Sequence, residues 1–215
     1  RAEVVHDRDV SREEAETVMA RTLYTAPTVE PVDLQTAKSL LRIENAALDA
    51  ALAILLVTAR QWIERTYDVA LITQVWDVFF DPPGSAVRSL VLLPAPIQSV
   101  TSVTSYSATD VATVMAATDY VVDVASQPAR LVLRASASWE DGSLDGWPTG
   151  LRPANAIAVR VSAGFGATAA AVPGTLVLGI VALAGYWLDH PEDAGDGVPP
   201  YLGTLLSAFV PPTVG

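Results

Sequence analysis

The sequence predicts an α+β fold, and two observations lead to this prediction. Apolar residues recur at helical spacing towards both ends of the chain, whereas the middle consists of short segments rich in Val, Thr, Tyr and Leu. The predicted order is helices, then strands, then helices. This order is expected of an α+β protein, since α/β proteins alternate strands and helices. The composition is that of a folded protein, because 51% of the 215 residues are hydrophobic and only 17% are charged.

Two helices are predicted before the strands. Asp33 is a favourable N-cap for a helix that runs to about Arg42. A longer helix is predicted over residues 46–66, where apolar residues recur every three or four positions. We interpret this stripe as core packing; it consists of Leu48, Leu52, Leu55, Ala59 and Ile63.

The middle of the chain predicts strands. A strand that begins near Ile72 ends at the turn Asp81-Pro82-Pro83-Gly84. Further strands are predicted over residues 88–93, 97–106, 119–124, 130–134 and 157–162. Residues 135–153 are expected to form a loop, and its Trp139 and Trp147 either make an exposed contact surface or lie under the sheet.

Two more helices are predicted after the strands. The segment between Arg160 and Asp189 carries no charge, but a helix that begins at Pro173 would extend only about 24 Å at 1.5 Å per residue. A bilayer core is about 30 Å thick, so a buried core helix is predicted. Gly179 and Gly185 lie inside this helix, and we expect another backbone to approach them. A last helix is predicted over residues 200–209.

The N-terminal residues predict a short helix that needs a partner. Ser11 and Glu14 have the spacing of a capping box, which favours a helix over about residues 11–23. Such a helix has few large apolar residues, so it would not be stable alone. The dipeptides Ala26-Pro27 and Glu30-Pro31 end it.

The chain offers few residues for catalysis. It contains no cysteine and two histidines, His6 and His190, and it has no nucleophile elbow or phosphate-binding glycine loop. The most favourable metal candidate is an acidic loop that contains Asp189, His190, Glu192, Asp193 and Asp196. Its spacing matches no calcium-binding loop, so we interpret it as a solvated surface. No catalytic, cofactor-binding or metal-ligating residue is predicted, and a metal-dependent hydrolase that uses residues 189–196 is the alternative function.

The charge balance argues against nucleic-acid binding through phosphates. The formal net charge is −11, and Lys38 is the sole lysine. Neutralising phosphates requires clustered Lys and Arg side chains. DNA is therefore not predicted to be bound by the free protein.

A series of segments in fixed order resembles a known family. The most specific is Ala70-Leu71-Ile72-Thr73-Gln74-Val75-Trp76, a strand entry that follows the second helix. The others are residues 32–43, 48–59, 63–67, 93–103, 119–123, 128–131, 152–157 and 163–166, and the Pro173 helix that ends in Tyr186-Trp187. Across residues 32–209 the chain resembles the head–tail connector (adaptor, or head-completion) proteins of tailed phages, which also occur in phage-like gene transfer particles.

The resemblance implies a fold and a division of the chain. It implies a mainly α-helical bundle with an inserted antiparallel β-element. The implied parts are an N-terminal arm (residues 1–31), a connector domain (32–209) and a C-terminal tail (210–215). Within the connector domain, helices at 33–67 and 173–209 enclose a β-insert at 70–163.

The resemblance also implies a structural role rather than an enzymatic one. Members form a ring, commonly of twelve subunits, between the portal protein and the stopper or tail-completion protein, and DNA passes through the lumen. The implied location is the neck of a virion or phage-like particle, assembled in the bacterial cytoplasm, with no cofactor and no membrane contact. The segment at residues 199–215 would reach the portal.

Four apolar residues of the last helix are predicted to make that portal contact: Tyr201, Leu205, Leu206 and Phe209. The same stripe would serve equally well for packing against the protein's own Pro173 helix. The sequence leaves these two alternatives open.

Overall fold

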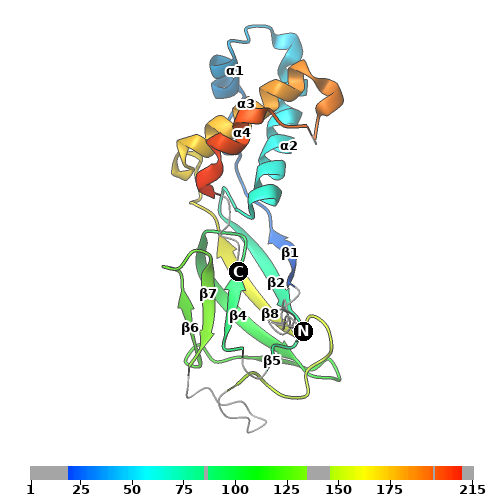
Figure 1. The fold of residues 1–215 in the computed structure, drawn as a ribbon, viewed down its shortest axis with the longest axis vertical. Helices are drawn as coiled ribbons and strands as arrows, with labels where there is room; N and C mark the ends of the chain where they lie inside the picture. The colour runs from blue at the N-terminus through cyan, green and yellow to red at the C-terminus, as the bar shows by residue number, and fades with distance from the viewer. Residues whose placement is uncertain (1–18, 85–86, 135–145, 196, 210–215) are drawn as a thin grey trace, which may run out of the picture.

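The computed structural model describes residues 19–84, 87–134, 146–195 and 197–209. The molecule is elongated, with the helices gathered at one end and the strands at the other (Figure 1). The helices are α1 (Leu34–Leu41), α2 (Asp49–Tyr67), α3 (Gly174–Asp189) and α4 (Pro200–Leu205), with short 3-10 turns η1 (Ala46–Leu48), η2 (Ala169–Ala171), η3 (Pro191–Asp193) and η4 (Ser207–Phe209). The strands are β1 (Met19–Thr25), β2 (Gln74–Phe80), β3 (Ser89–Leu92), β4 (Ile97–Tyr106), β5 (Ala112–Val114), β6 (Tyr120–Asp123), β7 (Ala129–Leu133) and β8 (Ile157–Ala163).

The strands form two antiparallel sheets. Five strands pair in the order β1-β2-β8-β4-β5, and three pair in the order β3-β7-β6. Alternate residues of the larger sheet, such as Val78 on β2 and Val159 on β8, point to one face and are fully buried. They share a hydrophobic cluster with Leu92 and Leu131 of the smaller sheet. The two sheets therefore enclose a core of their own.

The helices form a second core. Leu52, Leu56 and Ile63 of α2 pack with Leu176 and Leu183 of α3 in one cluster of buried residues. The predicted N-cap of α1 is confirmed, since the Asp33 carboxylate accepts a hydrogen bond from the Thr36 backbone N–H at 2.8 Å. The sequence predictions for all four helices are confirmed to within a few residues.

The prediction of a mainly helical bundle is wrong, although the α+β class is confirmed. Of the described residues, 35% are helical and 30% are in strands, so neither type of structure dominates. The β-region has its own buried cluster and also recruits β1, which precedes the first helix in the chain. Strands β2–β8 lie between α2 and α3 in the chain, and with β1 they make up a region comparable in size to the helical one.

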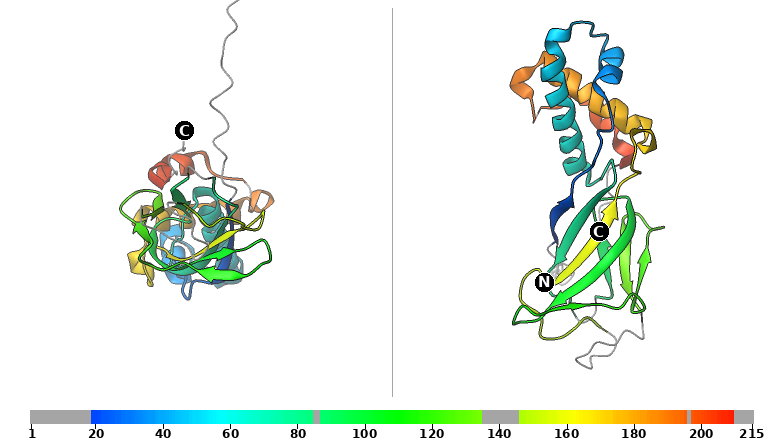
Figure 2. Two further views of the ribbon diagram at one scale, coloured as in Figure 1. Left: turned by 90° about the horizontal axis from the view of Figure 1, so that it is seen from below. Right: turned by 180° about the vertical axis from the view of Figure 1, so that it is seen from behind.

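The predicted helix over residues 11–23 is wrong where the structure describes it. Met19–Thr25 forms strand β1, which pairs with β2 at the edge of the larger sheet (Figure 2). Tertiary contacts hold it there: the Arg160 guanidinium lies 3.6 Å from the Tyr24 ring centre, and Arg21 forms an ion pair with Asp68. Residues 11–18 lie outside the described residues. Strand β5 is likewise an edge strand that the sequence did not predict.

Two glycines of α3 adjoin side chains rather than the backbone that the sequence analysis expected. A Cβ atom on Gly179 would lie 3.0 Å from Cδ2 of Leu206, and one on Gly185 would lie 2.6 Å from Cδ2 of Leu41. The glycines therefore make room for leucines of α1 and of the segment that follows α4.

Helix α2 together with η1, over Ala46–Tyr67, is long and apolar enough to cross a membrane by length and composition alone. A core helix of a globular protein passes the same test; 28% of the apolar window is buried, and the buried face of α2 packs into the helical core. Its Leu52 and Ile63 are fully buried in the helical core. Its Arg60 is buried and forms ion pairs with Glu30 and with Glu64 of the same helix. The ion pair with Glu30 fixes the segment before α1 against α2.

Candidate functional site

The C-terminal helix α4 is docked on α3 by its buried face. Leu202 is 1% exposed and Leu206 is fully buried, where it contacts Gly179 of α3. The Phe209 ring, which follows in η4, meets Phe165 edge to face with ring centres 6.4 Å apart. The end of the described chain is thus packed against the loop after β8.

The four residues predicted to contact the portal take different positions. Tyr201 is 56% exposed and is available to a partner. Leu205 and Phe209 are partly buried against the helical core, and Leu206 is part of that core. For Leu206 the structure therefore shows the alternative, packing on the protein's own α3, while the portal contact of the stripe stays a prediction.

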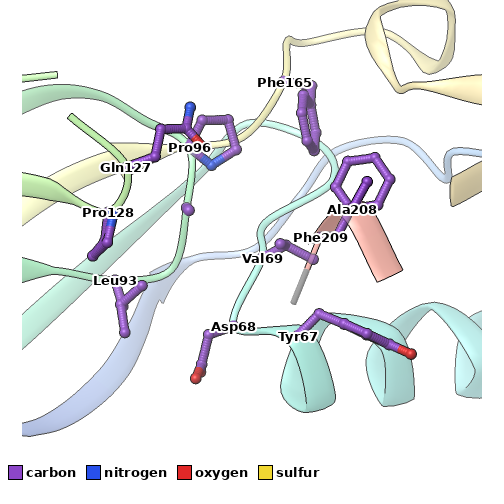
Figure 3. A pocket seen from close by; sticks show the side chains of 11 residues that line it. Tyr67, Asp68, Val69, Leu93, Pro96, Gln127, Pro128, Phe165, Ala208 and Phe209 are labelled. Carbon is purple, nitrogen blue, oxygen red and sulfur yellow. The ribbon is translucent and has the colours of Figure 1, made fainter. Parts of the chain in front are cut away.

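A pocket of about 340 Å³ lies where the helices meet the sheets (Figure 3). It is lined by Tyr67, Asp68, Val69, Leu93, Ala95, Pro96, Gln127, Pro128, Phe165, Ala208 and Phe209. Its size falls in the range of ligand pockets, about 300–1,000 Å³. Most of its lining side chains are apolar, so it is suited to binding an apolar segment rather than to acid–base chemistry.

Backbone hydrogen bonds fix the walls of this pocket. The Ala70 N–H donates to the Ala95 carbonyl at 2.7 Å, and the Ala95 N–H donates to the Asp68 carbonyl at 2.8 Å. On the opposite wall the Phe165 N–H donates to the Leu71 carbonyl at 3.2 Å. The segment after α2 is therefore hydrogen-bonded to both neighbouring loops.

The lining comes from five separate parts of the chain, and that is why sequence reasoning missed the pocket. They are the end of α2, the stretch between β3 and β4, the turn before β7, and the segments after β8 and α4. The available signals were the prolines at positions 96 and 128 and the Gly164-Phe165-Gly166 turn, which are ordinary turn residues when considered one at a time.

Polar side chains of the acidic loop contact Tyr186 at the end of α3. The Tyr186 hydroxyl donates to Asp193 Oδ2 at 2.6 Å, and this hydrogen bond raises the pKa of Tyr186. The His190 ring stacks on Tyr186 with ring centres 4.5 Å apart. Among the described residues no three His, Asp or Glu side chains converge to hold a metal ion, and Asp196 lies outside the described residues.

The two tryptophans of the long loop were predicted to be either exposed or buried under the sheet, and the structure distinguishes these alternatives for Trp147. Trp147 is 6% exposed and its Nε1 donates to the Val87 carbonyl at 2.9 Å, so it lies under the smaller sheet's edge as a core residue. Trp139 lies outside the described residues.

Two sheets with their own core, stacked end to end with a four-helix cap, define an α+β architecture that is found in solved particle necks. The chain has the same fold as a chain in the neck of an empty gene transfer agent particle computed with C6 symmetry, with a TM-score of 0.70 and 23% identity over 91% of this chain and 97% of that chain. It also matches a chain of the virion of a native gene transfer agent particle, with a TM-score of 0.71 and 23% identity over 91% and 97% of the two chains.

A third match is a chain in the neck of a native gene transfer agent particle computed with C12 symmetry. The TM-score is 0.63 and the identity 25%, over 90% of this chain and 97% of that chain. No protein-family model and no curated protein matches the sequence. The structural likenesses are consistent with the head–tail connector family of phage-like particles, which the sequence resembles.

Proposed function

We propose that this protein is a structural subunit of the neck of a tailed-phage or phage-like particle, and that it forms a ring of twelve copies between the portal protein and the stopper or tail-completion protein. The observation that carries the proposal is the extent of the match: 97% of each neck or virion chain is covered by one continuous fold. A ring is supported by the sixfold and twelvefold symmetry with which those two necks were computed. Assembly in the bacterial cytoplasm and location in the particle neck follow from the same proposal.

The charge of the chain suits a channel through which DNA moves. Twelve copies of a subunit with net charge −11 surround the lumen with negative potential. Attraction to phosphates would hold the duplex in place, whereas repulsion lets it slide. The proposed role is passage of DNA without binding it.

Exposed apolar residues supply surfaces for neighbours in the proposed ring. Ile54, in the N-terminal half of α2, is 68% exposed, and Leu178 of α3 is 49% exposed. At the sheets, Val114 of β5 is 66% exposed at an edge. Edge strands and uncharged helix faces are where subunits of like charge can approach one another.

An enzymatic role is not proposed. The alternative, a metal-dependent hydrolase that uses the acidic loop, would need convergent carboxylates with open coordination positions. In the described part of that loop Asp193 is engaged by the Tyr186 hydroxyl instead. No observation therefore favours the hydrolase over a structural role.

The proposal is tested by co-expressing the protein with the portal protein of its particle and imaging the purified complex by negative-stain electron microscopy. We expect a second ring stacked on the portal ring at its tail-facing end. Portal expressed alone is the control, and it should lack this ring. The proposal would be overturned if the two proteins purify separately and the portal images are unchanged.

A further inference from the structure

The pocket at the helix–sheet junction has walls of the kind that bind proline-containing segments. Phe165 and Phe209 form one side, with their rings edge to face, and Pro96 and Pro128 lie on the other side (Figure 3). Aromatic-lined grooves bind extended proline-rich segments, because such segments lose little conformational entropy on binding. The single charged lining residue, Asp68, is neutralised by its ion pair with Arg21.

A segment of matching chemistry begins at the rim of this pocket. Phe209 is followed in the sequence by Val-Pro-Pro-Thr-Val-Gly, six residues without a charged side chain in a protein of net charge −11. Phe209 itself lines the pocket, and this segment follows Phe209 directly in the sequence. An extended run of six residues spans at most about 20 Å, so these residues stay within reach of the pocket walls.

We propose that residues 210–215 bind in this pocket of their own chain, with Pro211 and Pro212 against the aromatic rings. Bound there, the segment would join the helical half, through Phe209, to the turns that carry Pro96 and Pro128 in the β-half. The proposal does not depend on the neck function, since it concerns the single subunit. If the segment also contacts a portal protein, it must leave the pocket to do so.

Disulfide trapping in the full chain tests the proposal, because the chain contains no cysteine of its own. The test pair is Thr213→Cys with Gln127→Cys, at the exposed rim of the pocket. The matched control pair is Thr213→Cys with Thr204→Cys, on the exposed face of α4 outside the pocket lining. Binding raises the local concentration of the thiols, so the test pair should form an intrachain disulfide about tenfold faster than the control pair.

Replacing Pro211 and Pro212 by Asp should slow the test pair to the rate of the control pair. Urea denaturation of the double variant serves as the control for an unchanged fold. Equal rates for the two pairs would overturn the proposal. So would a test pair that yields disulfide-linked dimers instead of an intrachain bond, since the occupant would then be a second copy.

A second measurement uses no cysteine and keeps the proposal testable if Gln127→Cys disturbs the fold. The amide NMR signals of Phe165, Val69 and Ala95 are compared between the parent chain and P211D/P212D. Shifts confined to pocket residues are the expected result. Unchanged signals would overturn the proposal.

Discussion

Gly164 is the residue on which the loop after β8 depends most directly. Its φ angle is +136°, and a Cβ atom there would lie 2.7 Å from the backbone carbonyl carbon and oxygen of Ile72. The Gly164 N–H donates to the Pro96 carbonyl at 2.9 Å, so the same residue also ties the loop to the strand entry of β4. Only glycine combines this conformation with this close approach of another backbone.

Gly164→Ala is therefore expected to lower the free energy of unfolding by about 3 kcal/mol, from backbone strain together with the clash. Urea denaturation measures this change. Gly203→Ala in α4 is the matched control, because nothing lies within 4 Å of its Cβ position. It should stabilise the protein by up to about 1 kcal/mol through helix propensity. Equal effects of the two substitutions would contradict the prediction.

Asp123 accepts several hydrogen bonds in the turn before β7. Its Oδ2 accepts hydrogen bonds from Ser126 Oγ at 2.6 Å and from Arg130 Nη2 at 2.7 Å. These bonds, the Ser126 bond foremost, hold the pKa of Asp123 well below its ordinary value of 3.8. Because the folded-state pKa is lowered, the stabilisation is complete above the unfolded-state pKa and is lost as the pH falls below it.

Asp123→Asn should accordingly flatten the loss of stability between about pH 4 and pH 2. The measurement is the urea midpoint as a function of pH. Ser126→Ala removes the strongest hydrogen bond and should flatten the curve in the same direction. A profile for D123N as steep as that of the parent would show that other carboxylates control acid unfolding.

At the scale of elements, the helices and most strands follow from local pattern, while β1 and β5, the two edge strands of the larger sheet, do not. The strand predicted over residues 157–162 is confirmed as β8, and its Val159 and Val161 are fully buried. Strand β1 was predicted as a helix, since Ser11 and Glu14 have capping-box spacing. In the structure its Leu23 is 45% exposed and its Tyr24 60%. Its pairing with β2 and the contact of Tyr24 with Arg160 are tertiary interactions that override local propensity.

The residues in and after helix α4 that were predicted to contact a partner differ in burial. Leu206 is buried and holds the helix on α3, whereas Tyr201 is exposed. Leu206→Ala should destabilise the protein by about 2–5 kcal/mol, because it empties a fully buried site against Gly179. Tyr201→Ala, at a 56% exposed position, should change stability by less than about 0.5 kcal/mol. Chemical denaturation of both variants checks this difference.

Under the proposed function Tyr201→Ala should instead weaken co-purification with the portal protein. A variant that keeps both its stability and its portal association would exclude Tyr201 from the contact. A small effect of Leu206→Ala on stability would show that α4 is not fixed to α3 as the structure has it.

At the scale of the whole molecule, the two cores could not be predicted from the sequence. The residues of each cluster show the right burial pattern, but nothing local says that residues 70–163 have a core separate from that of the helices. The junction pocket is harder still to predict, since Tyr67, Pro96, Pro128 and Phe165 come from segments far apart in the chain. The site exists only after both halves have folded and been placed end to end (Figure 1).

The net charge of −11 makes a prediction about assembly that belongs to the molecule as a whole. Subunits of like charge repel one another, and salt screens this repulsion, with a screening length of about 10 Å at 0.1 M and about 3 Å at 1 M ionic strength. If apolar surfaces such as that of Ile54 join the proposed ring, its formation should therefore strengthen as salt is added. Sedimentation velocity at increasing NaCl concentration measures this dependence.

Asp189→Asn with Glu192→Gln removes two negative charges from exposed positions and should shift ring formation to lower salt. The opposite trend, rings that dissociate as salt is added, would mean that ion pairs between subunits outweigh the general repulsion. The contacts would then have to be sought among the exposed arginines, such as Arg65 and Arg130, rather than on the uncharged faces of the helices.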